Sequence, residues 1–291
     1  VGREFTEATA WQYRFFVPHD VNGMVNLFGG TEDFTQALDD LFSTTKGVEG
    51  HQSDITGLIG QYAHGNEPSH HMAYLYNYIG QPWKTQAWTR RLLDEMYQPT
   101  PEGISGNEDC GQMSAWYILS AMGFYPVCPG SNEFVLTTPQ FEQVDLKLAN
   151  GKTLTITANN PKKNIYIDQV TLNGQAIDKN FITYEQLMEG GTLAYTLVDQ
   201  PNTDRGTSVE AFPYSYTAGK VVSIPSISKD LNLFMDEITF SIVSATEGCR
   251  IYYTLDGTEP TEKSALYEKP ITLTDTKTFL AKAFKEGYEL S

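Results

Sequence analysis

Residues 106–125 read Gly-Asn-Glu-Asp-Cys-Gly-Gln-Met-Ser-Ala-Trp-Tyr-Ile-Leu-Ser-Ala-Met-Gly-Phe-Tyr. The second half of this stretch repeats apolar residues at helical spacing and predicts a helix that Gly123 ends in a left-handed conformation. The first half predicts a loop, in which Asp109 and Gln112 have the spacing of a capping box. Glu108 and Asp109 would then lie at the positive end of a helix, where anionic side chains are favoured. A helix cap alone would explain both acids, and a catalytic pair is the alternative.

Two earlier segments also place an acid where a helix begins. The sequence from Thr6 to Tyr13 predicts a helix with Glu7 in its first turn, although favourable pairing with the helix dipole would be enough to explain this residue. Residues 64–67, His-Gly-Asn-Glu, precede a predicted helix that has Pro68 at its first position and ends at Gly80.

Residues 64–71 contain three of the chain's five histidines. Zinc is one interpretation, but His70 and His71 are adjacent and would point apart on a helix, so one ion could not easily use both. The side-chain oxygens of Asn66 and Glu67 are better suited to sugar hydroxyls or to calcium.

Helical periodicity continues to residue 123 and includes predicted helices over residues 31–42 and 83–97. If these helices pack as antiparallel pairs around an axis, alternate helix starts meet at one rim. Glu7, the loop 64–67 and the pair Glu108 and Asp109 would then share a cleft.

After Gly130 the period changes from helical to two, and Asn-Gly pairs at 150–151 and 173–174 predict hairpins. We therefore expect an antiparallel β-region packed on the helices. A linker signature at residues 219–228 precedes a second set of alternating segments, which predicts a small immunoglobulin-like β-sandwich. The predicted domains are a helical domain over 1–128, the β-region over 129–221 and the sandwich over 222–291.

The composition narrows the classes of function. A formal net charge of −16 argues against nucleic acid and against an anionic membrane surface as partners. No apolar run approaches the roughly 20 residues of a membrane span. An acidic chain with 17 Tyr, 15 Phe and 4 Trp suits a neutral partner such as carbohydrate. The chain begins at Val1 without a methionine, so we expect that an upstream segment has been removed.

The three cysteines do not have the spacing of a metal site. Cys110 and Cys128 could form a disulfide, but the odd count that Cys249 brings makes free thiols equally compatible with the sequence.

Three blocks of sequence, Phe5–Tyr13, His64–His71 and Gly106–Tyr117, resemble the family 92 glycoside hydrolases, and the resemblance runs from Val1 to about Thr217. It implies a calcium-dependent, inverting exo-α-mannosidase whose catalytic domain is a six-hairpin (α/α)6 toroid preceded by a large β-sandwich. This chain would hold the C-terminal part of that toroid, without the N-terminal β-sandwich. Residues 251–261 are similar to the module that ends chitobiase-type secreted glycosidases.

The resemblance also implies roles for individual residues. Glu7 corresponds to the family's general acid, and Asp109 is the expected base with Glu108 as its partner. An inverting glycosidase needs a protonated carboxyl at the leaving oxygen and a carboxylate on the opposite face, with room for water between them.

Substrate contacts are expected from the loop 64–67 through His64, Asn66 and Glu67, and from Trp11. The expected calcium ligands are Asn66, Glu67 and Asp109. The implied substrates are mannose-containing glycans, with α-1,2-linked mannose and N-glycan degradation as the expected activity, outside the cytoplasm. Two alternatives remain open, a non-catalytic carbohydrate-binding fragment and a structural helical domain, and they differ in whether Glu7 and Asp109 face each other across a cleft.

Overall fold

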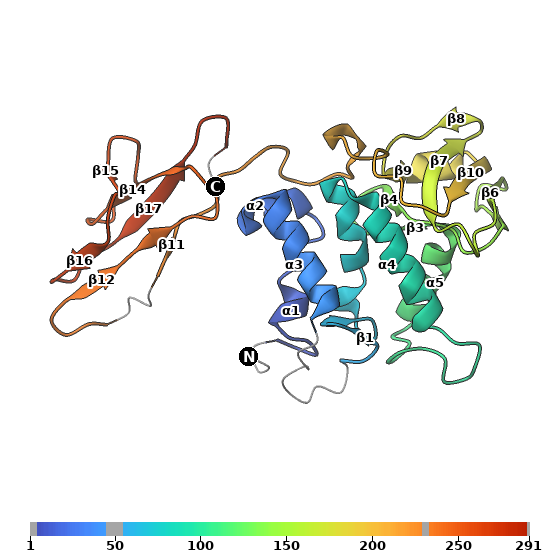
Figure 1. Ribbon diagram of the computed structural model, residues 1–291, viewed down its shortest axis with the longest axis horizontal. Coiled ribbons are helices and arrows are strands. Elements are labelled where there is room, and N and C mark those ends of the chain that lie inside the picture. The colour runs from blue at the N-terminus through green and yellow to red at the C-terminus, as the bar shows by residue number, and fades with distance from the viewer. Residues whose placement is uncertain (1–4, 45–54, 229–232, 290–291) are drawn as a thin grey trace. The chain divides into compact units, whose positions relative to one another are not determined.

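The computed structural model describes residues 5–44, 55–228 and 233–289 (Figure 1). The chain divides into two compact units. One consists of residues 1–19 and 37–214, and the other of residues 20–36 and 215–291. The second unit therefore includes a segment from within the predicted helical domain. Among the described residues, no helix is both long enough and apolar enough to span a membrane.

The predicted helices over 31–42, 83–97 and the second half of the opening stretch are confirmed. The helices that the first unit contains before its β-region are α1 (Ala10–Tyr13), α3 (Thr31–Ser43, from Ala37 onward), η1 (Glu67–Ser69), η2 (Met72–Ile79), α4 (Pro82–Glu95) and α5 (Gln112–Met122). As predicted, Gly80 and Gly123 end η2 and α5 with left-handed φ of 72° and 100°. The segment η2 is a 3₁₀ helix in which every residue is buried, so packing on all sides accompanies its tighter geometry.

Of the three predictions that placed an acid at a helix start, the one for Glu67 agrees with the start of η1, and those for Glu7 and Asp109 are wrong in detail. The helix α1 begins only at Ala10, because Thr9 and Gln12 form the capping box, and Glu7 lies before the cap. At α5 the cap position is Gly111, in a left-handed conformation and without a side-chain hydrogen bond, so Asp109 does not cap the helix. At α1 and at α5 the local sequence pattern predicted the helix correctly but not the residue at which it begins.

A short hairpin leads into the first of the predicted substrate loops. Its strands are β1 (Leu58–Ile59) and β2 (Tyr62–Ala63). The loop from His64 to Asn66 follows β2 directly, so the hairpin fixes where that loop begins.

The β-region contains a five-stranded sheet in the order β5-β6-β10-β7-β8. Its strands are β5 (Gln143–Lys147), β6 (Thr153–Ala158), β7 (Tyr166–Leu172), β8 (Gln175–Ala176) and β10 (Gly191–Val198). The hairpins predicted at Asn150-Gly151 and Asn173-Gly174 are confirmed. The prediction of a wholly antiparallel region is wrong, because β6 and β10 pair in parallel. A long connection through the intervening strands allows this direction, which a tight hairpin would not.

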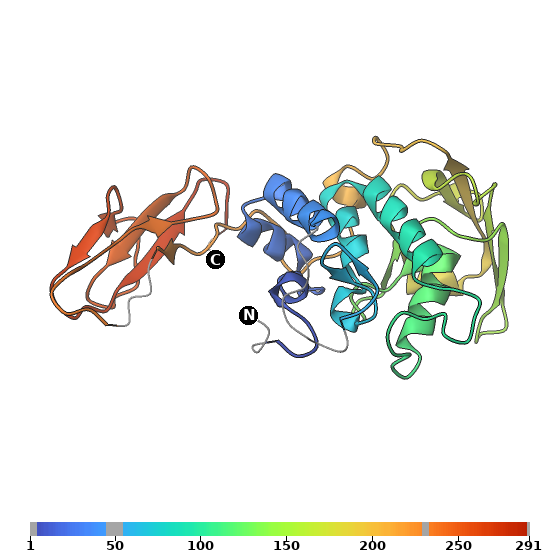
Figure 2. The same ribbon diagram turned by 60° about the horizontal axis from the view of Figure 1, so that its bottom comes forward.

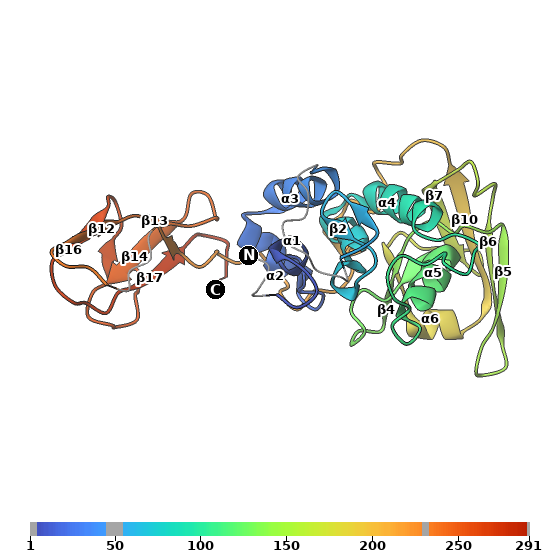
Figure 3. The ribbon, with the colours of Figure 1, turned by 90° about the horizontal axis from the view of Figure 1, so that it is seen from below.

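A second sheet joins β3 (Phe124–Tyr125), β4 (Glu133–Leu136) and β9 (Phe181–Thr183), and the short helices α6 (Tyr184–Met188) and η3 (Val209–Ala211) follow β9 in the chain. In Figures 2 and 3 the strands of the five-stranded sheet lie beyond α4 and α5, and α4 and α5 pack on each other while α4 also packs on β7.

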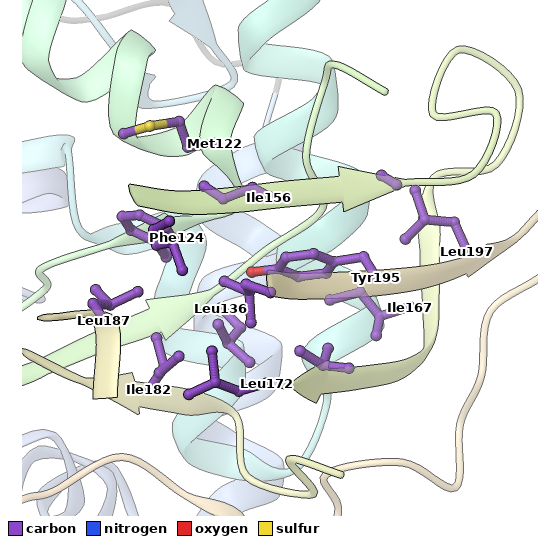
Figure 4. Packing of buried hydrophobic residues seen from close by; sticks show 14 residues of the cluster. Met122, Phe124, Leu136, Ile156, Ile167, Leu172, Ile182, Leu187, Tyr195 and Leu197 are labelled. Carbon is purple, nitrogen blue, oxygen red and sulfur yellow. The ribbon is translucent and has the colours of Figure 1, made fainter. Parts of the chain in front are cut away.

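One hydrophobic core connects the end of α5 with these two sheets (Figure 4). Met122 and Phe124 enter it from the helix side, and the inward-facing residues of the strands complete it. Tyr195 also donates its hydroxyl hydrogen to the carbonyl of Gly123 at 3.0 Å. The sheets therefore hold the C-terminal end of α5, while its first turn remains beside the acid-bearing loop.

The second unit has a smaller core of its own, to which Val222, Phe240 and Ile251 belong. It contains the helix α2 (Val21–Phe28), which the sequence analysis missed, and the strands β11 (Ser226–Ile227), β12 (Ile238–Phe240), β13 (Ile242–Val243), β14 (Arg250–Thr254), β15 (Ala265–Leu266), β16 (Ile271–Leu273) and β17 (Leu280–Phe284). These strands form small sheets of two or three strands, and their assignment to an immunoglobulin-like sandwich stays a prediction.

The segment that resembled a linker is hydrogen-bonded to α2 within the second unit. The carboxylate of Asp20 accepts hydrogen bonds from the hydroxyls of Ser215 and Thr217 and from the Thr217 amide. The side chain of Asn22 donates to the carbonyls of Thr217 and Gly219. Gly219, where the predicted linker starts, is therefore hydrogen-bonded to α2, as are the residues just before it, and this part of the chain is not a flexible connection.

The three cysteines are free thiols, so the disulfide considered for two of them is absent. They are Cys110, Cys128 and Cys249.

Candidate active site

The loop over residues 106–111 turns through strained backbone conformations before α5. Asp109 and Cys110 have φ of 52° and 55°, which side chains with a Cβ rarely adopt. The carboxylate of Glu108 accepts hydrogen bonds from the Ser114 amide at 3.1 Å and from its hydroxyl at 3.0 Å. Glu108 therefore holds the first turn of α5, and the side chain of Asp109 is exposed.

Glu7 shares this unusual backbone, with φ of 55°. The other non-glycine residues with positive φ among those described are Cys110 and two turn asparagines, in addition to Asp109. Strain of this kind gathers at functional sites, where the surrounding structure imposes it. At Glu7 a contact of this kind comes from Asn66, which is 5% exposed. Its Nδ2 donates a hydrogen bond to the carbonyl of Glu7 at 2.6 Å.

The two loops that carry the other acids are packed backbone against backbone. The Gly65 amide donates to the carbonyl of Thr56 at 3.1 Å. A Cβ added to Gly65 would lie 2.0 Å from the Thr56 hydroxyl oxygen, and one added to Gly106 would lie 2.6 Å from the Gly65 carbonyl. Gly106 also has φ of 77°. Gly106 therefore permits a separation of the two loops that a residue with a Cβ would not allow, and Gly65 permits the close approach of Thr56.

This packing brings the carboxyl groups of Glu67 and Asp109 into hydrogen-bonding contact, and Glu7 lies near enough for its charge to act on Glu67. Burial raises the pKa of Glu67, and the negative charges of Asp109 and Glu7 raise it further, against a hydrogen bond from the Glu67 backbone amide. The structure therefore brings together the acids that the sequence placed in three separate blocks. A raised pKa in such a cluster is typical of acid–base sites.

His64 lies beneath this cluster and is fully buried. Its Nε2 lies 2.8 Å from the Tyr97 hydroxyl, and its Nδ1 lies 2.8 Å from the Tyr62 hydroxyl. Because the Tyr97 hydroxyl donates its hydrogen to the carbonyl of Met113 at 3.1 Å, it must accept from His64 Nε2. His64 is therefore protonated on Nε2 and accepts from Tyr62 on Nδ1. Burial lowers its pKa well below the usual value, with a further contribution from His70.

His70 makes a second connection between the same loops. Its Nε2 donates to the carbonyl of His64 at 2.9 Å, which leaves Nδ1 as an acceptor. The Gln112 amide nitrogen donates to that Nδ1 at 3.1 Å and to the Tyr125 hydroxyl at 3.0 Å. Burial lowers the pKa of His70 to about 4, despite the His64 carbonyl and the charge of Asp109, so the ring is neutral near pH 7.

The remaining predicted residues lie elsewhere. The ring of Trp11 is half-buried and has the Arg14 guanidinium 5.2 Å from its centre, with no described contact to the carboxyl cluster. His71 is buried and donates from Nε2 to the carbonyl of Phe15 at 2.7 Å. It therefore supports the segment that follows α1.

Sequence reasoning missed the tyrosines that hold the histidines, and it took Gln112 for part of a helix cap. A buried tyrosine needs a partner for its hydroxyl. Tyr97, at the end of α4, and Tyr125, just after α5, both lie near a histidine-rich loop in space but far from it in sequence. The aromatic content was visible in the sequence, whereas these pairings were not.

The chemistry of the donors at the cluster fits a hard divalent cation. Glu67 and Asp109 offer oxygen atoms in contact with each other, and the neighbouring residue Asn66 has an amide oxygen that its bond from Nδ2 to the Glu7 carbonyl does not use. Among the described residues, no group of three His, Cys, Asp or Glu side chains is close enough to hold a metal ion. The other ligands of such a cation would therefore be amide or carbonyl oxygens, water or sugar hydroxyls.

Comparisons with known proteins show which family the chain is similar to. The family model for the glycosyl hydrolase family 92 catalytic domain matches residues 1–199, and that for the chitobiase/beta-hexosaminidase C-terminal domain matches residues 233–291. A protein of Arthroderma benhamiae named "Uncharacterized secreted glycosidase" is 34% identical over 221 residues, which are 75% of this chain and 26% of that protein.

Two solved structures from Bacteroides thetaiotaomicron are also similar. One is a family GH92 α-mannosidase in complex with mannoimidazole, with 43% identity, a TM-score of 0.69 and coverage of 72% of this chain and 28% of that chain. The other is a family GH92 inverting mannosidase, with 41% identity, a TM-score of 0.64 and coverage of 73% and 30%. The chain thus spans about a quarter to a third of the length of these relatives. Because the family match covers residues 1–199 of 291, the chain belongs to glycosyl hydrolase family 92.

Proposed function

We propose that the protein containing this chain is a calcium-dependent, inverting exo-α-mannosidase that removes α-1,2-linked mannose outside the cytoplasm. The observation that carries the proposal is the meeting of Glu7, Glu67 and Asp109 in one cluster. The similar structures named as mannosidases support the substrate class, and the relative named as a secreted glycosidase supports the location.

In this proposal Glu7 protonates the leaving oxygen and Asp109 activates the water. The inverting reaction requires the two carboxyls to be roughly 6.5–9.5 Å apart, so that a water molecule fits between them. Glu108 is assigned the role of orienting the base, since its carboxylate is bonded to Ser114 at the start of α5.

The loop 64–67 binds substrate and metal in this proposal. Asn66, Glu67 and Asp109 would hold calcium, which would grip neighbouring sugar hydroxyls and favour the planar geometry of the transition state. The buried ring of His64 has both nitrogens engaged by tyrosines, so its contribution to substrate binding is to position the loop.

The direct test is hydrolysis of the α-linked mannobiose isomers by the intact parent protein, with the anomeric form of the released mannose followed by NMR. We expect the α-1,2 isomer to be cleaved fastest, with β-mannose as the first product. A calcium chelator should abolish turnover, and added Ca²⁺ should restore it. Release of α-mannose would overturn the inverting mechanism, and cleavage of none of the isomers would overturn the mannosidase assignment.

A non-catalytic carbohydrate-binding role is the second candidate for the chain by itself. The short span relative to its relatives favours it, because a cleft built from several segments is incomplete in a fragment. Binding of mannobiose by the isolated chain, without release of mannose, would be its signature.

A further inference from the structure

The hydrogen-bond chain behind the cluster fixes which atoms of Gln112 and Tyr125 remain for a ligand. Since His70 Nδ1 accepts a hydrogen bond, the Gln112 atom next to it must be the amide nitrogen. That nitrogen uses one hydrogen on His70 and the other on the Tyr125 hydroxyl. The Gln112 amide therefore has a single possible orientation, with Oε1 turned away from both partners.

The hydrogen bonds of Tyr125 can be assigned in the same way. The Tyr125 oxygen accepts from Gln112, and its own hydrogen has no acceptor among the described residues. Gln112 Oε1 likewise has no donor there. Tyr125 is 8% exposed and Gln112 is half-buried, and the charge of Glu67 acts on the Tyr125 hydroxyl. A donor and an acceptor are therefore left open beside the carboxyl cluster.

We propose that Gln112 and Tyr125 form a hydroxyl-recognition pair, in which one sugar hydroxyl donates to Gln112 Oε1 and accepts the hydrogen of Tyr125. The inference rests on the proposed function in that the ligand is a sugar. A hydroxyl group can do both at once, whereas a metal cation satisfies the amide oxygen but cannot accept a hydrogen. A sugar that lacks this hydroxyl leaves both protein atoms without a partner, which is the usual origin of strong discrimination.

His70 is then a positioning residue for the pair. It acts through the Gln112 amide, and its own orientation is set by the carbonyl of His64. The buried indole nitrogen of Trp116 donates to the His70 carbonyl at 2.9 Å and fixes its backbone. These bonds fix the position of the loop 64–67 relative to Gln112 and Tyr125.

The test measures binding of D-mannose and its 2-, 3-, 4- and 6-deoxy analogues to the intact protein with saturating Ca²⁺. Loss of the recognised hydroxyl should weaken binding by about five- to tenfold, the usual worth of a neutral hydrogen bond. Tyr125→Phe should weaken binding of mannose by a similar factor and should not weaken binding of that one analogue further. Tyr117→Phe is the matched control, because this tyrosine on α5 bonds to Gln140 instead. It should leave every binding constant unchanged.

Equal weakening of mannose and of every analogue in Tyr125→Phe would overturn the pair. A lower affinity of Gln112→Ala for Ca²⁺, measured in the absence of sugar, would also overturn the pair, because Gln112 would then be a metal ligand. The ¹⁵N NMR signals of His70 check the scaffold, and we expect the Nε2-protonated form to persist in Tyr125→Phe. A shift to the other tautomer would contradict the orientation on which the pair depends.

Failure of the mannosidase assignment would look different. Preference for glucose or galactose over mannose, with the same Tyr125-dependent loss for one deoxy analogue, would overturn the substrate and leave the pair standing. Cleavage of mannobiose without any analogue-specific loss would overturn the pair alone. Binding of no hexose at all would overturn both.

Discussion

The carboxyl groups of Glu67 and Asp109 are in hydrogen-bonding contact, although Glu67 is the first residue of η1 and Asp109 lies in the loop before α5. Two carboxylates repel each other unless a proton or a cation lies between them. The close approach of Gly106 to the Gly65 carbonyl allows the two loops to come near enough for this contact.

Glu67→Gln should separate the chemical need for this carboxyl from its structural role. The amide donates a hydrogen bond to Asp109 and removes one negative charge, so the free energy of unfolding should stay within about 1 kcal/mol of wild type or rise. The affinity for Ca²⁺ should fall at least tenfold if Glu67 is a ligand. Calorimetric titration with Ca²⁺ measures this, with Glu95→Gln, a change at an exposed residue of α4, as the control. Unchanged affinity would remove Glu67 from the metal site.

Glu7→Gln should distinguish the general acid from other carboxyls. The change keeps the shape and removes the proton donor, which is worth about 10²–10⁴-fold in rate. An aryl α-mannoside with a good leaving group needs less protonation and should be affected less than mannobiose. Asp109→Asn should impair both substrates alike, because water must be activated whichever group leaves. Comparison of kcat/KM for the two substrates decides the roles, and equal losses in Glu7→Gln would show that Glu7 is not the acid.

Gly106→Ala should inactivate the protein by separating the two loops. The added methyl would overlap the Gly65 carbonyl, and the position has φ of 77°. Gly111→Ala is the control, because its φ of 97° imposes a similar backbone cost but no atom lies within 4 Å of the added Cβ. We expect both variants to lose roughly 1 kcal/mol from backbone strain. Only Gly106→Ala should lose substrate binding as well, and equal activities would disprove the close approach of the loops.

His71 should make the first unit less stable in acid. Burial lowers its pKa to about 4, with a smaller lowering by His70 and an opposing effect of the hydrogen bond to Phe15. An unfolded histidine has a pKa of about 6.5, so between these values the unfolded chain takes up a proton that the folded chain does not. The contribution of His71 alone should therefore lower the stability by about 3 kcal/mol as the pH falls from about 6.5 to about 4, and His64 and His70 should add to the fall.

Tryptophan fluorescence during urea unfolding reports on this unit, because all four tryptophans lie within it: Trp11, Trp83, Trp88 and Trp116. His71→Gln keeps a donor for the Phe15 carbonyl and removes the titration. It should therefore lose a corresponding part of the pH dependence, and an unchanged pH dependence would contradict the assignment to His71.

Asp20→Ala should release α2 from the segment that begins at Ser215. The carboxylate caps the helix through the Gly23 amide and binds both side chains of Ser215 and Thr217. Losing these bonds should destabilise the second unit by roughly 2 kcal/mol, since bonds to a charged group are stronger than neutral ones. Amide hydrogen exchange in α2 measures the effect, and Ser215→Ala, which removes one bond, should show a smaller one. Unchanged protection would mean that α2 is held by other contacts.

The sequence by itself determined the elements whose signals are local. The apolar spacing in α3, α4 and α5 gave these helices, and the Asn-Gly turns gave the hairpins, because each signal extends over only a few consecutive residues. The three blocks also contain Glu7, Glu67 and Asp109, the acids that the proposed site combines.

Tertiary structure alone decided how those acids are presented. The left-handed backbones of Glu7 and Asp109, outside the helices that they were predicted to begin, depend on contacts such as the bond from Asn66 to the Glu7 carbonyl. The parallel pairing of β6 with β10 and the orientation of Gln112 are likewise set by partners distant in sequence. Periodicity describes neighbours along the chain, whereas strain, tautomers and charge clusters arise from neighbours in space.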